Sequence, residues 1–327
     1  MALPKSGNSA VPVLILFGPT ASGKTSLAEE LFSGNKPLCK AEIISADSMQ
    51  VYRGMDIGTA KPSAELQKKL PHHLIDIQNP NEQFNAGDFV RLADSACREI
   101  ISRSALPVLL GGTGFYLKNF IYGLPSAPPS NPNLREKLKE ELDRNGPKAL
   151  HERLAALDMV SAEKIHVNDS YRVLRALEVC ISSGFPLSSF TQEKTQRPLY
   201  RFLTAGLQLS REELYNRIND RCEEMFRRGL PKEVEGLYKQ GYTPNDPGLR
   251  AIGYREFFVQ NTEGQWGLSG DLDGVKALIA QNSRRYAKRQ GCFFASIRDV
   301  VWFSAADRYT TLDLLSSLIH TELKPIS

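Results

Sequence analysis

A short glycine-rich stretch near the start of the chain, GPTASGKT from Gly18 to Thr25, constrains the fold more than any other feature. It fits the pattern G-x-x-x-x-G-K-[ST], which is typical of a loop whose backbone N–H groups hold phosphates. The apolar run VPVLILF precedes the loop, and SLAEELF, with helical spacing, follows it. A strand, a phosphate loop and a helix in this order predict an α/β fold with an anion site at the helix N-terminus.

The candidate phosphate-binding residues are those of the loop itself: Gly18, Pro19, Thr20, Ala21, Ser22, Gly23, Lys24 and Thr25. Their backbone N–H groups would hold the anion, Lys24 would add a full positive charge, and the Thr25 hydroxyl would reach a Mg2+ ion. A glycine-rich turn that matches by chance is the alternative. The loop alone does not distinguish ATP from other molecules with adjacent phosphates.

The first part of the chain has the pattern of a parallel sheet. Up to about Tyr122, short apolar runs alternate with helix-like stretches, as in strands joined by crossover helices. Strands are predicted at residues 11–17, 41–45, 73–77 and 106–110, and later at 201–210 and 300–304. Between 89 and 101, apolar residues recur at three- and four-residue spacing, which indicates a helix that packs on the sheet.

The middle of the chain has a different texture. LPSAPPSNPN, from Leu124 to Asn133, contains four prolines and is typical of a linker. The residues that follow favour helices up to about Ser189, and one helix is expected to open at Asp169 or Ser170 and to close at Gly184. We therefore expect a P-loop NTPase-like α/β core from residues 1–128 and 198–327, with a mostly helical insertion domain at 129–197.

Composition adds a few limits. The 327 residues carry a formal charge of +4 and five scattered cysteines without metal or redox spacing, so a reducing compartment is expected. VPVLILF is too short to span a bilayer and no targeting segment is expected, which favours the cytoplasm and no membrane partner. A basic run, RRYAKR at 284–289, is on charge alone better explained as a solvated helix face than as a polyanion site.

Two polar residues follow predicted strands. Asp47 comes just after the second strand, and Thr113 lies in GGTG after the fourth. Because the carboxyl ends of parallel strands meet in one crevice, Asp47 and the phosphate loop should face the same cavity. Asp47 could accept a proton from a nucleophile, or it could be a turn cap or a ligand of metal-bound water. GGTG could approach a ligand closely, or it could be a tight turn that starts a helix.

Together these stretches resemble the bacterial tRNA dimethylallyltransferases. The resemblance rests on GPTASGKT, ISADSMQVYRGMDIGTAKP, HHLIDI, FNAGDF, PVLLGGTGFYL, YRVLRALEV and AIGYREF, which are spread over most of the chain. Members of this family transfer a dimethylallyl (isopentenyl) group from dimethylallyl diphosphate to N6 of adenosine 37, just 3′ of the tRNA anticodon, and release diphosphate. The chain lacks a Cys/His cluster near its end, which resembles the bacterial rather than the eukaryotic form.

The resemblance implies roles for the polar residues. The loop would bind the diphosphate of the prenyl donor and not ATP, with Lys24, Thr25 and Mg2+ neutralising its charge. Asp47 would orient the adenine N6 as base or acceptor, and Thr113 would bond the bridging oxygen of the leaving group. Arg217 and Arg221, four residues apart, would reach the diphosphate, with a solvated helix stripe as the alternative.

The same resemblance implies a tRNA-binding set and a monomer. The set comprises Asp47, Ser48, Met49, Gln50, Thr113, Arg135, Tyr171, Arg172, Arg175, Gly253 and Arg255. For AIGYRE, which contains Gly253 and Arg255, a buried turn is the alternative. Three other functions stay open: a nucleotide kinase, an isopentenyltransferase acting on free AMP, ADP or ATP, and a non-catalytic RNA-binding module.

Overall fold

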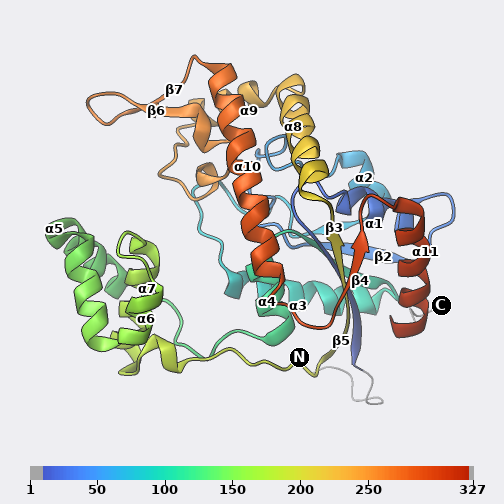
Figure 1. Ribbon diagram of the computed structural model, residues 1–327, viewed down its shortest axis with the longest axis horizontal. Coiled ribbons are helices and arrows are strands. Elements are labelled where there is room, and N and C mark those ends of the chain that lie inside the picture. Colours follow the sequence, from blue (N-terminus) through green and yellow to red (C-terminus); the bar gives the residue numbers. More distant parts are fainter. Residues whose placement is uncertain (1–9, 324–327) are drawn as a thin grey trace. The chain divides into compact units, whose positions relative to one another are not determined.

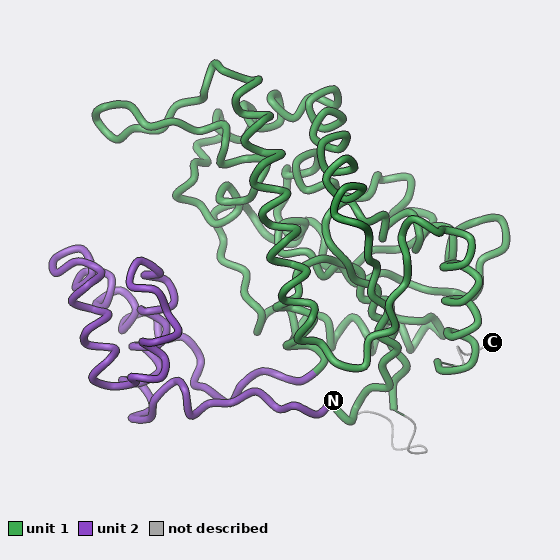
Figure 2. The backbone as a smooth tube through the Cα atoms, viewed as in Figure 1, with its two compact units in different colours: residues 1–121, 197–327 green, residues 122–196 purple. Residues whose placement is uncertain are grey.

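The computed structural model describes residues 10–323, which form two compact units. Unit 1 comprises the chain up to Ile121 and from Arg197 onward, and unit 2 comprises Tyr122–Gln196 (Figure 2). The strands are β1 Val11–Phe17, β2 Ala41–Ser45, β3 His72–His73, β4 Leu106–Gly111, β5 Tyr200–Gln208, β6 Phe258–Gln260, β7 Trp266–Leu268 and β8 Val300–Ser304.

The helices of unit 1 are labelled in Figure 1. They are α1 Lys24–Ser33, α2 Ala64–Lys69, α3 Ala86–Ser102, α4 Gly114–Tyr122, α8 Arg211–Arg227, α9 Leu230–Lys239, α10 Leu272–Phe294 and α11 Arg308–Leu318, with short turns η2 Gly248–Arg250, η3 Arg255–Phe257 and η4 Ile319–Leu323. Unit 2 contains α5 Pro132–Leu157, α6 Met159–Lys164, α7 Ser170–Ser183 and η1 Leu187–Ser189.

Unit 1 is built on a six-stranded sheet with the order β3-β2-β4-β1-β5-β8. Each neighbouring pair in it is parallel, and β1 lies between β4 and β5. The α/β fold with a parallel core predicted from the sequence is therefore confirmed, including the strands predicted at 11–17, 41–45, 106–110, 201–210 and 300–304. The short antiparallel hairpin β6–β7 has no counterpart among the predicted strands.

The strand predicted at 73–77 is mostly wrong. Only His72 and His73 pair with β2. Leu74 and Asp76 have φ values of 64° and 54°, in the left-handed region, which a continuing strand does not allow. The chain bends there because the Asp76 carboxylate pairs with the buried Lys61 ammonium and its backbone N–H bonds to Gln50.

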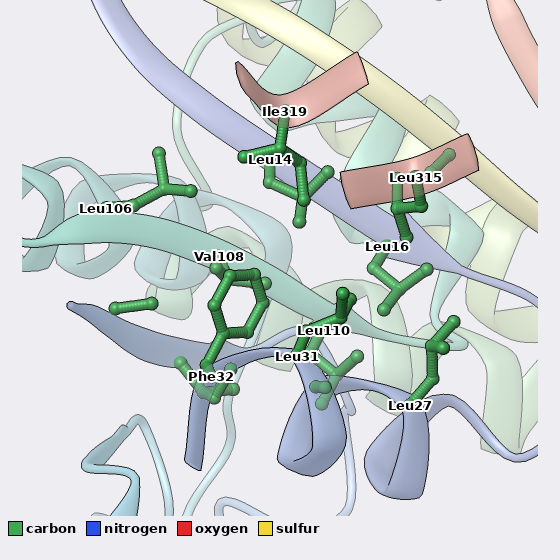
Figure 3. Packing of buried hydrophobic residues seen from close by; sticks show 14 of the residues in the cluster. Leu14, Leu16, Leu27, Leu31, Phe32, Leu106, Val108, Leu110, Leu315 and Ile319 are labelled. Atoms are coloured by element: carbon green, nitrogen blue, oxygen red, sulfur yellow. The ribbon is translucent and has the colours of Figure 1, made fainter. Parts of the chain in front are cut away.

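Alternating side chains of the sheet form two hydrophobic layers. Leu14 and Leu16 point to one face, where α1 and α11 cover them with residues such as Leu31 and Leu315 (Figure 3). On the other face, the Phe17 ring lies 4.8 Å from the Phe294 ring of α10. Burial of each such side chain contributes about 1.5–3 kcal/mol, so the layers fix the ends of the strands relative to the helices.

Unit 2 is helical, as the sequence predicts. Leu138, Leu150 and Leu154 of α5 pack on Leu177 of α7 in a core of their own. The Asp169 carboxylate caps α7 by accepting the Arg172 N–H, and Gly184 ends the helix with a φ of 74°. In the part of the chain from 10 to 323, no helix is both long and apolar enough to cross a membrane.

Candidate active site

A cavity of about 260 Å³ opens in unit 1 where the carboxyl ends of β1, β2 and β4 meet. Thr20, Lys24 and Thr25 of the phosphate loop line it together with Asp47, as the parallel strand order predicts. The four-residue segment Asp47–Gln50 forms one wall. The helices α8 and α10, which pack side by side, form another (Figure 1).

The phosphate loop leaves the first turn of α1 without a side-chain cap. Its N-cap residue, Gly23, has a φ of 84° and makes no capping hydrogen bond. Backbone N–H groups at this helix end therefore stay available for an anion. The Lys24 Nζ folds back over the loop and donates to the carbonyl oxygens of Gly18, at 3.0 Å, and Pro19, at 2.7 Å.

The charge of Lys24 depends on its surroundings in the cavity. Removal from bulk water, together with the positive charge of Arg221, lowers the pKa of Lys24 to about 7. The negative charge of Asp47 acts in the opposite direction and favours the ammonium form. Burial likewise lowers the pKa of Arg221. The cavity thus concentrates positive charge that an anionic ligand would stabilise.

The segment after β2 is held by hydrogen bonds. The Asp47 Oδ1 accepts the Met49 N–H at 2.9 Å, and the Thr113 Oγ1 accepts the Ser48 N–H at 3.0 Å. Gln50 Oε1 accepts the Ser45 hydroxyl at 2.8 Å. Asp47 is therefore part of an Asx turn, which agrees with the turn-cap alternative. Asp47 also lines the cavity.

The glycines of GGTG make room for neighbouring protein atoms. A Cβ at Gly111 would lie 2.3 Å from the Ala46 carbonyl oxygen, and one at Gly112 would lie 2.5 Å from the Gln290 Nε2. The first approach, to a backbone oxygen, is possible only without a side chain, whereas at Gly112 the Gln290 side chain would have to move. α4 starts at Gly114, directly after this turn.

The loop DIGTAKP, residues 56–62, is held in place by hydrogen bonds and an ion pair. Glu233 of α9 accepts the backbone N–H groups of Asp56 and Ile57, at 3.1 and 2.8 Å. The Tyr254 hydroxyl also donates to Glu233, at 2.6 Å, while the buried Lys61 pairs with Asp56 at 2.7 Å. These contacts hold the following residues, Gly58, Thr59 and Ala60, against the cavity.

Part of the cavity wall is apolar. Ile43 and Leu110 contribute from the sheet, and the other side is lined by Ile218, Cys222 and Met225 of α8, Ile252, and Ile279 of α10. Burial raises the pKa of the Cys222 thiol, so this residue belongs to the uncharged surface. The cavity can therefore hold an anionic group and an uncharged hydrocarbon group together.

The two predicted diphosphate-binding arginines do not share one cavity. Arg221 lines the cavity described above. Arg217 lies at a separate cavity of about 190 Å³, beside Ser22 and Gly23 of the phosphate loop and Ser26 of α1, and donates to the Ala305 carbonyl at 3.4 Å. Both side chains are thus close to the loop, but they border different cavities.

Two cavity residues of α10, Tyr286 and Gln290, are absent from the predicted site. Both fall in or next to the basic run 284–289, which charge alone assigned to a solvated helix face. The lining residues of α10 are Ile279, Ser283, Tyr286 and Gln290. Their spacing of three and four residues is a helical stripe, and this was the signal that could have found them.

The predicted tRNA-binding residues are dispersed. Ser48, Met49, Gln50 and Gly253 line the cavity, where Gly253 has a φ of 98°, and Arg255 is exposed on η3. In unit 2, Arg175 Nη1 and Arg135 Nη1 donate to Glu178, at 2.9 and 3.4 Å. Tyr171 is 62% exposed, and Arg172 is exposed beside it.

A metal ion would find few protein ligands at this site. Within residues 10–323 there is no group of three or more His, Cys, Asp and Glu side chains placed to hold one. The exposed Thr25 hydroxyl at the start of α1 borders the cavity and can supply one oxygen. One protein oxygen plus phosphate oxygens and waters is a donor set that Mg2+ accepts.

The fold and the cavity together define a P-loop α/β protein in which a phosphate site, a carboxylate and an apolar wall share one cavity. The family model described as IPP transferase matches residues 50–297. The chain therefore belongs to the IPP transferase family.

Relatives and solved structures agree with this family. The chain is 41% identical over 312 residues to the tRNA dimethylallyltransferase of Geobacter sulfurreducens, covering 94% of this chain and 96% of the relative. It is 36% identical to the structure of a tRNA isopentenylpyrophosphate transferase from Bacillus halodurans, with a TM-score of 0.65 over 96% of this chain and 97% of that one. A eukaryotic dimethylallyltransferase acting on tRNA superposes with a TM-score of 0.74 at 26% identity, covering 96% and 76%.

Proposed function

We propose that this protein transfers a dimethylallyl group from dimethylallyl diphosphate to N6 of adenosine 37 in tRNA and releases diphosphate. The observation that carries the proposal is the single cavity that Lys24, Asp47 and an apolar wall line together. A prenyl diphosphate has one strongly anionic end and one hydrocarbon end, which matches the two kinds of wall. Relatives named for this activity, one of them at 41% identity, support it.

The phosphate loop would hold the leaving group. Backbone N–H groups at the start of α1 and the Lys24 ammonium would contact the diphosphate, with Arg221 adding charge from α8. Arg217 would approach from the other side of the loop. Mg2+ bound to Thr25 and the phosphates would neutralise further charge. Each group stabilises charge that grows as the carbon–oxygen bond breaks, which is where catalysis gains most.

Asp47 and Thr113 would act on the two reacting ends. An exocyclic amine is a weak nucleophile, so Asp47 would orient the adenine N6 and accept its proton. The Thr113 hydroxyl would donate to the bridging oxygen of the departing diphosphate. An allylic carbon ionises readily once its leaving group is stabilised, so positioning and electrostatics account for most of the rate.

The RNA would bring an unpaired base into the cavity. A loop adenine must leave its stack to reach the reactive carbon, and unpaired bases do so at low cost. Segment Asp47–Gln50 and Gly253 would contact this base from the cavity wall, with Arg255 nearby on the surface. The helical unit, predicted at 129–197, would contact tRNA through the exposed Tyr171 and Arg172. Arg135 and Arg175 would contribute as well, although both also donate to Glu178.

A product analysis tests this proposal. The protein is incubated with dimethylallyl diphosphate, Mg2+ and unmodified tRNA, and the RNA is digested to nucleosides. We expect isopentenyladenosine in the digest, from tRNA or an anticodon stem-loop and not from AMP. Consumption of ATP without this nucleoside would indicate a kinase, and prenylation of AMP would indicate a free-nucleotide enzyme.

Two further expectations belong to this proposal. All residues named for the chemistry come from one chain, so we propose that the monomer is active. We also propose that the reaction takes place in the cytoplasm, where its tRNA substrate would be found. Gel filtration during turnover tests the first, since activity should elute at the mass of one chain.

A further inference from the structure

The turn 251–256, AIGYRE, borders two cavities of unit 1. Gly253 lines the cavity of the proposed reaction, together with Ala251 and Ile252. Arg255 lines a second cavity of about 550 Å³, whose lining includes residues of the β6–β7 hairpin and of α10. One short turn therefore offers its backbone to the first cavity and an arginine to the second.

Glu256 ends this turn with a carboxylate that is almost fully buried, since only 1% of the side chain is exposed. A buried carboxylate is stable only when hydrogen-bond donors surround it. The Glu256 Oε2 accepts the Gly253 N–H at 2.9 Å, and its Oε1 accepts an N–H of the Asn282 amide at 2.8 Å. Asn282 belongs to α10, so the carboxylate ties the turn that lines the reaction cavity to this helix.

The third partner of this carboxylate is the Arg255 guanidinium. The Arg255 Nε donates to the Glu256 Oε1 at 3.3 Å, while 50% of the Arg255 side chain is exposed. Among residues 10–323, neither Nη atom of Arg255 donates to a protein atom. The protein thus holds one edge of the planar guanidinium and leaves the N–H donors of both Nη atoms for a ligand.

The ligand that this arrangement fits is a phosphate. The donors of a guanidinium form a planar fork that matches two oxygens of one phosphate. The base that is proposed to enter the reaction cavity has a phosphate of the RNA backbone on either side of its nucleoside. Phosphate contacts set the register of a nucleic acid on a protein, so an arginine held next to the cavity would place the backbone for entry of the base.

We propose that Glu256 is a positioning residue that aims the two Nη atoms of Arg255 at an RNA phosphate beside the base in the reaction cavity. This inference rests on the proposed function, because it takes tRNA as the ligand. Glu256 itself is buried, so it acts through Arg255. An arginine that is held in advance avoids the cost of ordering a long side chain when the RNA binds.

The first test is Glu256→Gln in the full-length protein, which releases Arg255 and keeps the other contacts of the turn. The new amide oxygen can still accept the Gly253 N–H, and Asn282 can turn its amide to accept from the new NH2 group. The Arg255 Nε, which can only donate, loses its acceptor. The Kd for tRNA, measured by filter binding, should rise about twofold to tenfold, while KM for dimethylallyl diphosphate stays within about twofold.

The sign of this effect separates positioning from simple electrostatics. Loss of one negative charge from a protein that binds a polyanion should by itself tighten binding slightly. Glu263→Gln removes the same charge from an exposed residue in the loop of the β6–β7 hairpin and is the matched control. Its tRNA affinity should equal or exceed that of the wild type. The same result for Glu256→Gln would overturn the inference.

A double-mutant cycle with Arg255→Ala tests whether Glu256 acts through Arg255. Arg255→Ala should weaken tRNA binding and lower the slope of log Kd against log salt concentration by about 0.7–0.9, the value for one phosphate contact. In this background Glu256→Gln should cause no further loss of affinity, because the group through which it acts is gone. An equal loss in both backgrounds would show a purely structural role and contradict the inference.

Arg255→Lys tests the same idea with the buried carboxylate left in place, in case Glu256→Gln does not fold. Lysine keeps the charge, but its single nitrogen replaces the fork that holds Glu256 and a phosphate together. Its tRNA affinity should therefore be lower than that of the wild type, and equal affinity would contradict the inference. A protein that binds tRNA as described but forms no isopentenyladenosine would overturn the proposed reaction and leave the phosphate contact standing.

Discussion

The cavity of unit 1 and the helical unit 2 use their motif residues in different ways. In unit 1, Lys24 and Arg221 border a cavity, and burial, together with the positive charge of Arg221, lowers the pKa of Lys24. In unit 2, Arg135 and Arg175 point at Glu178, which is fully buried and also accepts the Asn131 N–H at 2.5 Å. Charge in the first region is held ready for a ligand, whereas much of the charge in the second is neutralised within the protein. A motif can therefore mix contact residues with residues that only hold the fold.

The largest effect should come from Asp47→Ala. If Asp47 accepts the N6 proton, prenylation should fall by about 10² to 10⁴-fold. The affinity for tRNA should persist, because the rest of the binding surface is unchanged. Single-turnover prenylation and filter binding measure the two quantities.

Asp313→Ala, an exposed substitution on α11, is the control and should behave like the wild type. Retained turnover in Asp47→Ala would remove Asp47 from its proposed role and leave the cavity of unit 1 without its base.

Glu178→Ala should have the next largest effect, on stability. It removes the carboxylate that holds Arg135, Arg175 and the start of α5, and leaving cations unpaired costs about 3–5 kcal/mol. Limited proteolysis should show early cleavage in residues 122–196 while the sheet core resists.

Glu136→Ala is the matched control, because Glu136 makes only an exposed surface pair. Equal protease resistance of Glu178→Ala and Glu136→Ala would show that the arginines of unit 2 are not needed for its fold. The two regions would then differ less in how they use their charged residues.

Tyr171→Ala tests whether an exposed residue of unit 2 contacts tRNA, in contrast to the residues that stabilise this unit. The exposed ring offers a stacking platform, which is worth about 1–3 kcal/mol per base, so tRNA affinity should fall about fivefold to 150-fold. KM for dimethylallyl diphosphate should not change. Tyr309→Ala, an 83% exposed tyrosine on α11, is the control. An unaltered affinity would mean that Tyr171 does not contact RNA.

The smallest effect concerns pH and the charge of Lys24. Its pKa of about 7 means that the ammonium is lost as pH rises above 7, whereas a bound diphosphate requires it. Affinity should therefore be highest below pH 7 and fall by up to about tenfold per pH unit above it. Calorimetry with the unreactive dimethylallyl S-thiolodiphosphate measures this.

Lys24→Met is the control for that titration, because the ligand ionises in the same way with either protein. The variant should bind weakly with a flatter pH profile. Identical pH profiles of the wild type and Lys24→Met would show that Lys24 keeps its charge above pH 7. The charges of the cavity and of unit 2 would then differ less in their surroundings.

Local chemistry made much of the fold predictable. The phosphate loop specifies the order of strand, loop and helix, and Asp169 and Gly184 mark the ends of α7 through capping that depends on neighbouring residues. The predicted strand at 73–77 was wrong because Asp76 bends toward Lys61, and that ion pair depends on tertiary structure.

The site was predictable where it follows strand ends, as for Asp47. The contact of Gln290 with the phosphate loop was not, because its partner Thr20 is 270 residues away in the sequence. Tyr286 was hidden within a run of charges whose exposed members suggested a solvated face. Whether Arg135 and Arg175 contact RNA or stabilise unit 2 depends on Glu178, whose burial no spacing reveals.

The central claim is that the phosphate loop holds a group that leaves in the reaction. The most direct measurement is the ratio of diphosphate released to isopentenyladenosine formed, with tRNA and dimethylallyl diphosphate and without any nucleoside triphosphate. We predict one diphosphate for each modified adenosine. A requirement for ATP, or release of inorganic phosphate in place of diphosphate, would contradict this account.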